Sequence, residues 1–104
     1  MVKSMEVQEL HEKLKTDNNL LIVDVREQAE WDEVRIPGAI LLPLSELEKR
    51  FSELPKDKAL ILQCRSGKRS LNAGYFLADK GYTDLTNLEG GILAWMDEGY
   101  DIIE

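Results

Sequence analysis

Apolar residues along the chain alternate between helical spacing and short continuous runs. Val7, Leu10 and Leu14 fall at positions i, i+3 and i+7, which predicts one apolar face of a first helix. Residues 20–25 and 59–63 are instead nearly continuous apolar runs. Such runs are typical of strands that are covered on both faces of a parallel sheet.

Further elements follow the same alternation. Residues 39–42 and 84–88 are strand candidates, and helices are predicted over residues 71–78 and 92–98. Gly81 and Gly99 stand where these two helices should end. Strands that alternate with helices indicate an α/β fold with a mainly parallel sheet.

A further helix is predicted after the strand candidate at residues 39–42. Ser45 and Glu48 have the spacing of a capping box, so this helix is expected to begin at Ser45 and to run to about Leu54. Because no linker or repeat interrupts the chain, residues 1–104 are expected to form one domain.

Composition narrows the class of protein. Hydrophobic residues make up 43% and charged residues 32% of the 104 residues, which is typical of a globular domain. The net charge of −7 disfavours nonspecific binding to nucleic acid or to an anionic membrane. The longest uncharged apolar run, residues 39–44, is far below the roughly 20 residues that span a bilayer. With no apolar leader at the N-terminus, we expect a cytoplasmic protein.

The chain has one cysteine, Cys64, and one histidine, His11. A single cysteine excludes an internal disulfide and any multi-cysteine metal centre, and no metal or cofactor is expected. His11 lies on the first predicted helix, far from Cys64 in the sequence, and is interpreted as a surface residue.

The segment that follows the strand at residues 59–63 carries the candidate chemistry. It consists of Cys64, Arg65, Ser66, Gly67, Lys68, Arg69 and Ser70. Gly67 and Ser66 allow a tight arc in which backbone amides point inward, and a helix N-terminus adds its dipole there. A cysteine beside amides, a helix dipole and cations should have a stabilised thiolate, which is the nucleophilic form. A lone cysteine at the end of a strand usually serves only as a small buried apolar residue. The cationic, glycine-containing loop after Cys64 favours a reactive cysteine instead.

The chain resembles the rhodanese family of thiosulfate-type sulfurtransferases. The resemblance rests on five segments in the family's order, at residues 21–27, 36–39, 64–70, 81–82 and 87–95. It implies a three-layer domain, with a mostly parallel five-stranded sheet and helices on both faces. The family's usual Gly-His pair before residue 36 is replaced by Val34 and Arg35, so we expect local packing or the rim of the cleft to differ.

The resemblance also implies a reaction. The Cys64 thiolate takes the outer sulfur of thiosulfate or a similar donor, and the Cys64 persulfide passes it to cyanide or a thiol, including a protein thiol. Residues 65–70 are expected to bind the substrate, with Arg69 facing it and Ser70 capping the next helix. A carrier that holds the persulfide for partner proteins is the alternative.

A phosphatase or arsenate-reductase-like activity on the same fold is less favoured. A cysteine phosphatase needs an arginine six positions after the nucleophile, and Ser70 stands there, with the arginine one position earlier at Arg69. Elsewhere, Asp24 and Arg26 are interpreted as a pair that fixes neighbouring loops. Trp31 and Trp95 are expected to pack. Residues 27–33 are interpreted as a solvated acidic face, and residues 89–91 as a turn near the site.

Overall fold

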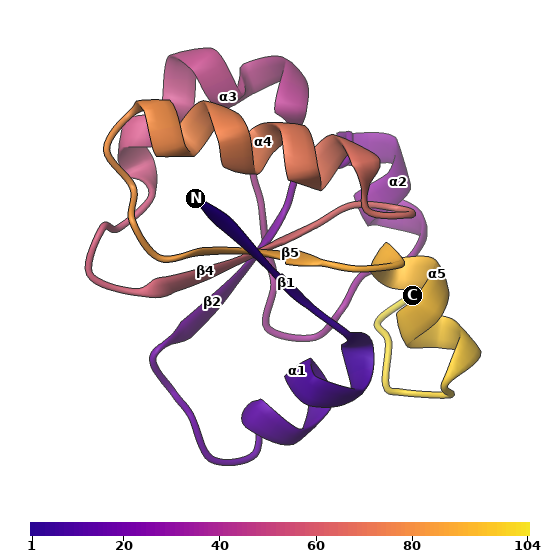
Figure 1. Ribbon diagram of the computed structural model, residues 1–104. Helices are drawn as coiled ribbons and strands as arrows, with labels where there is room; N and C mark the ends of the chain where they lie inside the picture. Colours follow the sequence, from indigo (N-terminus) through magenta and orange to yellow (C-terminus); the bar gives the residue numbers. More distant parts are fainter.

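A five-stranded sheet lies at the centre of the computed structural model, which describes residues 1–104 (Figure 1). The strands are β1 (Val2–Met5), β2 (Leu20–Asp24), β3 (Ile40–Leu41), β4 (Ala59–Gln63) and β5 (Leu85–Leu88). Their order across the sheet is β1-β5-β4-β2-β3, and every neighbouring pair is parallel. The expected α/β sheet is confirmed, with all rather than most of its pairings parallel.

Helices cover both faces of this sheet. They are α1 (Val7–Lys13), α2 (Gln28–Glu33), α3 (Leu44–Arg50), α4 (Lys68–Asp79) and α5 (Gly91–Asp97), with a 3-10 turn at Phe51–Glu53 after α3. Figure 1 shows α3 and α4 on one face and α1 and α5 on the other. None of these helices has the length and apolar character that crossing a membrane requires.

The two central strands explain why their sequences are apolar without alternation. Leu60 and Leu62 of β4 face the α3 and α4 side, whereas Ile61 faces the α1 and α5 side. In β2, Val23 and Ile22 divide in the same way. Both faces of each strand are therefore buried, and a continuous apolar run is what such a strand needs.

The path of the chain across the sheet brings two strand ends together. After β3 the chain passes back over β2 to form β4, so the direction of strand addition reverses between β2 and β4. Asp24, the last residue of β2, lies in register with Gln63, the last residue of β4. The segments that follow these strands therefore meet at a topological switch point, where α/β sheets usually bind ligands.

Two local features differ from the sequence prediction. The edge strand β1 was not predicted, because its four residues alternate weakly and only Met5 is buried. The capping box at Ser45 is wrong: α3 begins at Leu44, and the Ser45 hydroxyl donates to Glu27 Oε1 at 2.8 Å instead. A capping box is instead present at the start of α2, where the Glu27 amide donates to Glu30 Oε1.

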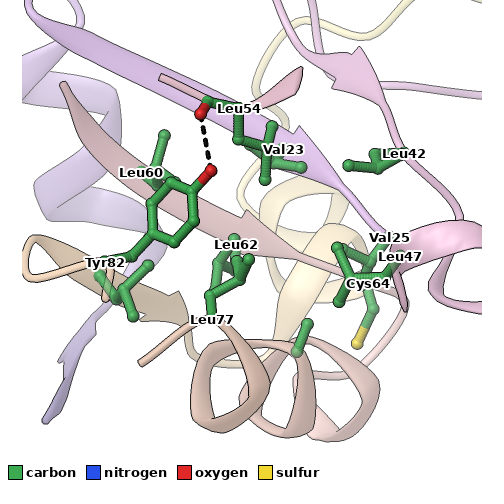
Figure 2. Close-up of a cluster of buried hydrophobic side chains, with 12 residues drawn as sticks. Val23, Val25, Leu42, Leu47, Leu54, Leu60, Leu62, Cys64, Leu77 and Tyr82 are labelled. Atoms are coloured by element: carbon green, nitrogen blue, oxygen red, sulfur yellow. Dashed lines mark hydrogen bonds between the residues drawn. The ribbon is translucent and has the colours of Figure 1, made fainter. Parts of the chain in front are cut away.

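Tyr82 closes the end of the α3 and α4 core that is farthest from Cys64 (Figure 2). Its hydroxyl lies 2.8 Å from the carbonyl oxygen of Phe51 and 2.7 Å from that of Leu54, and donates to this pair. The contact ties the 3-10 turn after α3 to the loop that follows α4. It also satisfies backbone acceptors that water does not reach freely.

Tyr82→Phe should lower the free energy of unfolding by about 1 kcal/mol, because a buried carbonyl loses its donor. Denaturant unfolding measures the change. Tyr75→Phe is the matched control: Tyr75 is 57% exposed, so loss of its hydroxyl should leave the free energy of unfolding unchanged. Equal stabilities of the two variants would contradict this role of the Tyr82 hydroxyl.

Candidate active site

Cys64 directly follows β4 and is almost fully buried, with 1% of its surface exposed. The pleat that points Leu62 towards α3 and α4 points Cys64 the same way. Figure 2 shows its sulfur beyond the carboxyl end of the strand, with Val25 and Leu47 beside it. The sulfur therefore lies on the floor of the site, held by a rigid strand on one side.

Three hydrogen bonds converge on the Cys64 sulfur. The Gly67 amide donates to Sγ at 3.1 Å, and the Ser70 amide and hydroxyl each lie 3.4 Å from it. Gly67 has a positive φ of 107°, so a residue with a side chain would be strained at this position. The predicted inward-facing amides are present.

The environment lowers the pKa of the Cys64 thiol. Burial is the largest single influence and raises the pKa. The Ser70 hydroxyl and the amides of Ser70, Gly67 and Ser66 together outweigh burial, because they donate to the anion. The leading stabilisers of the thiolate are thus hydrogen-bond donors rather than the neighbouring cations that the sequence emphasised.

The loop amides point inward because the loop carbonyls are held from outside. The Cys64 carbonyl accepts from the Ile92 amide at 2.9 Å and from Gln63 Nε2 at 2.8 Å, and the Arg65 carbonyl accepts from the Leu93 amide. In a trans peptide the carbonyl and the next amide point in opposite directions. The first turn of α5 therefore turns the Arg65 and Ser66 amides into the loop, and the Ser66 amide is among the donors that lower the pKa of the Cys64 thiol.

Gly91 makes this docking of α5 possible. A Cβ atom at Gly91 would lie 2.4 Å from the carbonyl oxygens of both Cys64 and Arg65, and its φ is +58°. No side chain fits in that gap. The predicted turn at residues 89–91 is therefore confirmed at the site, and its glycine serves close backbone approach.

Several loop amides have no acceptor in the protein. The amides of Arg65, Lys68 and Arg69 donate to no backbone or side-chain oxygen. The α4 helix begins at Lys68, so the last residues of the segment 64–70 lie in its first turn. The free amides and the N-terminus of α4 together make a cradle suited to an anion.

Ser70 does not cap α4, contrary to the sequence prediction. The N-cap is Gly67, and the fully buried Ser70 hydroxyl shares its single proton between Cys64 Sγ at 3.4 Å and Asn87 Oδ1 at 2.5 Å. Asn87 Nδ2 donates to the Gly67 carbonyl at 3.0 Å and to Glu89 Oε2 at 2.9 Å, which leaves Oδ1 as its acceptor. Asn87 was not predicted as part of the site, although it is the first residue of the segment 87–95 that contributes to the family resemblance.

The loop cations are divided between two settings. Arg65 and Lys68 are exposed and have no acidic partner, and Ser66 is also exposed. Arg69 instead forms a two-pronged ion pair with Glu30 of α2, with both N–O distances 2.8 Å. Arg69 is thus paired with an acid that the sequence did not connect to it, and Glu30 does not belong to a purely solvated face.

Asp24 and Arg26 form the buried pair that the sequence indicated. Arg26 Nε and Nη2 donate to the Asp24 carboxylate, and Nη2 also donates to the Val34 carbonyl. The pair thus ties the end of β2 to the segment after α2. At the departure from the family pattern, Arg35 donates to the Trp31 carbonyl and lies over the Trp31 ring.

His11 lies outside this site and is not a plain surface residue. Its ring stacks on Tyr100 with centroids 3.8 Å apart and meets the edge of Trp95, which is buried as expected. These rings line a hollow of about 310 Å³ between α1 and α5, to which no residue of the segment 64–70 contributes. No three His, Cys, Asp or Glu side chains gather anywhere in the structure as a metal site.

A parallel α/β sheet with a cysteine loop at its switch point fits the two activities weighed above for this fold, sulfur transfer and phosphate hydrolysis. Comparison with known proteins distinguishes between these two classes of domain. The Rhodanese-like domain family matches residues 6–98. The chain is 39% identical to a protein named sulfurtransferase from Allochromatium vinosum, covering 99% of this chain and 96% of that one. It is 36% identical to the putative sulfurtransferase YtwF of Bacillus subtilis, covering 93% of each.

Two further comparisons add to this picture. The putative sulfur carrier protein YrkF of Bacillus subtilis is 32% identical over 90% of this chain and 51% of its own. A rhodanese-related protein from Thermoplasma volcanium superposes with a TM-score of 0.89 at 34% identity, covering 97% of both chains. This chain therefore belongs to the rhodanese-like family, as the sequence motifs indicated.

Ser70→Ala should slow alkylation of Cys64 by iodoacetamide about tenfold at neutral pH, because a donor to the thiolate is lost. The pKa of the thiol rises, so less thiolate exists below it, and the two rates converge at high pH. Ser66→Ala keeps its amide and should behave like the unmodified protein. Superimposable pH profiles for Ser70→Ala and the unmodified protein would refute the role of the hydroxyl.

Gly91→Ala should push α5 away from the loop carbonyls and so lower the rate of Cys64 alkylation at least about tenfold. It should also lower the free energy of unfolding by about 2–4 kcal/mol. Gly99→Ala is the control, because Gly99 also has a positive φ but no atom lies within 4 Å of its added Cβ. It should cost about 1 kcal/mol and leave Cys64 reactive. Equal effects of the two variants on reactivity would overturn this account.

Proposed function

We propose that this protein transfers sulfane sulfur through a persulfide on Cys64, with thiosulfate or a thiol persulfide as donor and a thiol as acceptor. The observation that carries the proposal is the convergence of the Gly67 amide and the Ser70 amide and hydroxyl on the Cys64 sulfur. The family match and relatives named sulfurtransferase or sulfur carrier support sulfur transfer or persulfide carriage.

In the first half-reaction the Cys64 thiolate attacks the outer sulfur of the donor. A bond forms between Sγ and that sulfur, the donor's S–S bond breaks, and its electron pair leaves with sulfite or with a thiolate. The leaving group gains negative charge as the bond breaks. The unpaired amides of Arg65, Lys68 and Arg69 and the exposed side chains of Arg65 and Lys68 are suited to stabilise it.

In the second half-reaction an acceptor thiolate attacks the terminal sulfur of the persulfide, and Cys64 leaves as a thiolate. The donors that lower the pKa of the Cys64 thiol also make it a better leaving group. Because Cys64 is the only cysteine, the acceptor is external. This chemistry needs a free thiol, so we propose the reducing cytoplasm as its location.

A carrier role differs from an enzyme role only in the speed of small-molecule turnover. The relative named sulfur carrier favours keeping it as the second candidate. A carrier loads rapidly from a protein persulfide and turns over slowly with thiosulfate and cyanide, whereas an enzyme cycles with the small molecules. A phosphatase is not proposed, because the buried Ser70 occupies the position where an arginine is needed to hold phosphate.

Incubation of the reduced protein with thiosulfate should add the mass of one sulfur atom, detected by intact-protein mass spectrometry. Cyanide should remove this sulfur as thiocyanate. Cys64→Ser should gain nothing, because the nucleophile is absent. A protein cysteine persulfide serves as a second donor in parallel, so that the carrier role is also tested.

Failure of the unmodified protein to gain sulfur from either donor, while iodoacetamide still alkylates Cys64, would contradict the proposed function. A gain that persists in Cys64→Ser would contradict the assignment of the nucleophile.

A further inference from the structure

Among the three loop cations, only Arg69 is partly buried, and it already forms an ion pair with Glu30. Glu30 Oε1 and Oε2 each accept from the Arg69 guanidinium at 2.8 Å, and the two side chains are only 30% and 36% exposed. Glu30 is itself fixed, because its Oε1 also accepts from the Glu27 amide at the start of α2. The acid therefore belongs to a formed contact rather than to a freely moving surface.

The pair stays ionised wherever the thiolate exists. The hydrogen bonds from Arg69 lower the pKa of Glu30 to about 2. The pKa of Arg69 is raised, first by Glu30 and further by the charge of the nearby Cys64. Arg69 lies in the chain between Gly67 and Ser70, whose amides both donate to the sulfur, and Glu30 neutralises its guanidinium there.

The charge of a second arginine at this end of the sheet, Arg26, is also neutralised by an acid. Arg26 is buried in its pair with Asp24, so it too presents no net charge. Only Arg65 and Lys68 remain unpaired, and both side chains are exposed at the rim, where water and salt screen them. A small dianion that approaches the sulfur therefore meets the free loop amides and a neutralised Arg69, and the only unpaired cationic side chains of the loop are the solvent-screened Arg65 and Lys68.

We propose that Glu30 determines donor specificity: by neutralising Arg69, it disfavours dianionic donors such as thiosulfate and favours persulfides of neutral or cationic thiols, including cysteine persulfides of proteins. The inference rests on the proposed function. The reaction with the favoured donor balances without any further reagent. The Cys64 thiolate takes the outer sulfur of R–S–SH with its proton, and R–S⁻ leaves with the electron pair of the broken S–S bond.

The test compares donors of different charge in Glu30→Gln. Gln removes the charge but keeps the Oε1 acceptor that the Glu27 amide uses, so the start of α2 is preserved. The rate of Cys64 persulfide formation is measured with thiosulfate, a dianion, and with cysteamine persulfide, whose ammonium group keeps its net charge at zero or above whether or not the terminal sulfur is protonated. Glu30→Gln should raise kcat/KM for thiosulfate about fivefold or more and leave that for cysteamine persulfide within about twofold.

Two further variants separate charge from structure. Glu33→Gln removes one charge from the same helix at an exposed position with no ion pair, and it should leave the ratio of the two donors unchanged. Glu30→Asp keeps the charge and should retain the preference of the unmodified protein. An equal change for both donors in Glu30→Gln, a fall for thiosulfate, or the same shift in Glu30→Asp would overturn the proposal.

A readout that does not depend on sulfur transfer distinguishes failure of this inference from failure of the proposed function. Alkylation of Cys64 by iodoacetate, an anion, is compared with alkylation by neutral iodoacetamide. Glu30→Gln should raise the ratio of these rate constants about threefold or more, whereas Glu33→Gln should not. An unchanged ratio refutes the role of Glu30 even if persulfide forms. A raised ratio without persulfide formation supports the electrostatic role and refutes the sulfurtransferase instead.

Discussion

The contact between the first turn of α5 and the carbonyls of Cys64 and Arg65 controls the arrangement of the whole site. The Ile92 and Leu93 amides hold these carbonyls outside the loop, so the amides that follow must point inside. The contact requires glycine at position 91, because any Cβ would collide with both carbonyl oxygens. A helix from the end of the chain thus sets the polarity of a loop near its middle.

The sheet supplies the rigidity on which this contact depends. Parallel β2 and β4 end in register, and the buried Asp24–Arg26 pair fixes the segment beyond β2 while Cys64 begins the segment beyond β4. The two faces of the sheet serve different needs. The α3 and α4 face buries Cys64 against apolar side chains, which raises the cost of the thiolate, and the loop donors offset that cost.

Much of the fold follows from local sequence. The apolar runs of β2 and β4, and the Gly67 turn into α4, are signals within a few residues, so the α/β class and the cysteine loop could be predicted. Helix α3 was predicted with the wrong first residue, because the Ser45 hydroxyl bonds Glu27, 18 positions away, rather than its own helix. Strand β1 escaped prediction because an edge strand needs only one buried face.

The inner partners of the site could not be predicted, because each is joined to the loop only by the fold. Asn87 meets Ser70 across 17 positions, and Glu30 meets Arg69 across 39. From sequence alone, Ser70 fits a helix cap as well as it fits a contact with the sulfur. Glu30, in a polar helix, fits a solvated face as well as it fits an ion pair. Only the packing of β5 and α2 against the loop gives these residues their roles, and with them a loop in which one of three cations, Arg69, is neutralised.

The most direct test of this account is a pH titration of the Cys64 thiolate by its ultraviolet absorbance, with Cys64→Ser subtracted to remove the tyrosine contribution. The converging amides and the Ser70 hydroxyl predict a midpoint below that of an ordinary cysteine thiol. A midpoint at or above the ordinary value would mean that burial outweighs the loop donors. The central claim, that the fold prepares Cys64 as a nucleophile, would then be wrong.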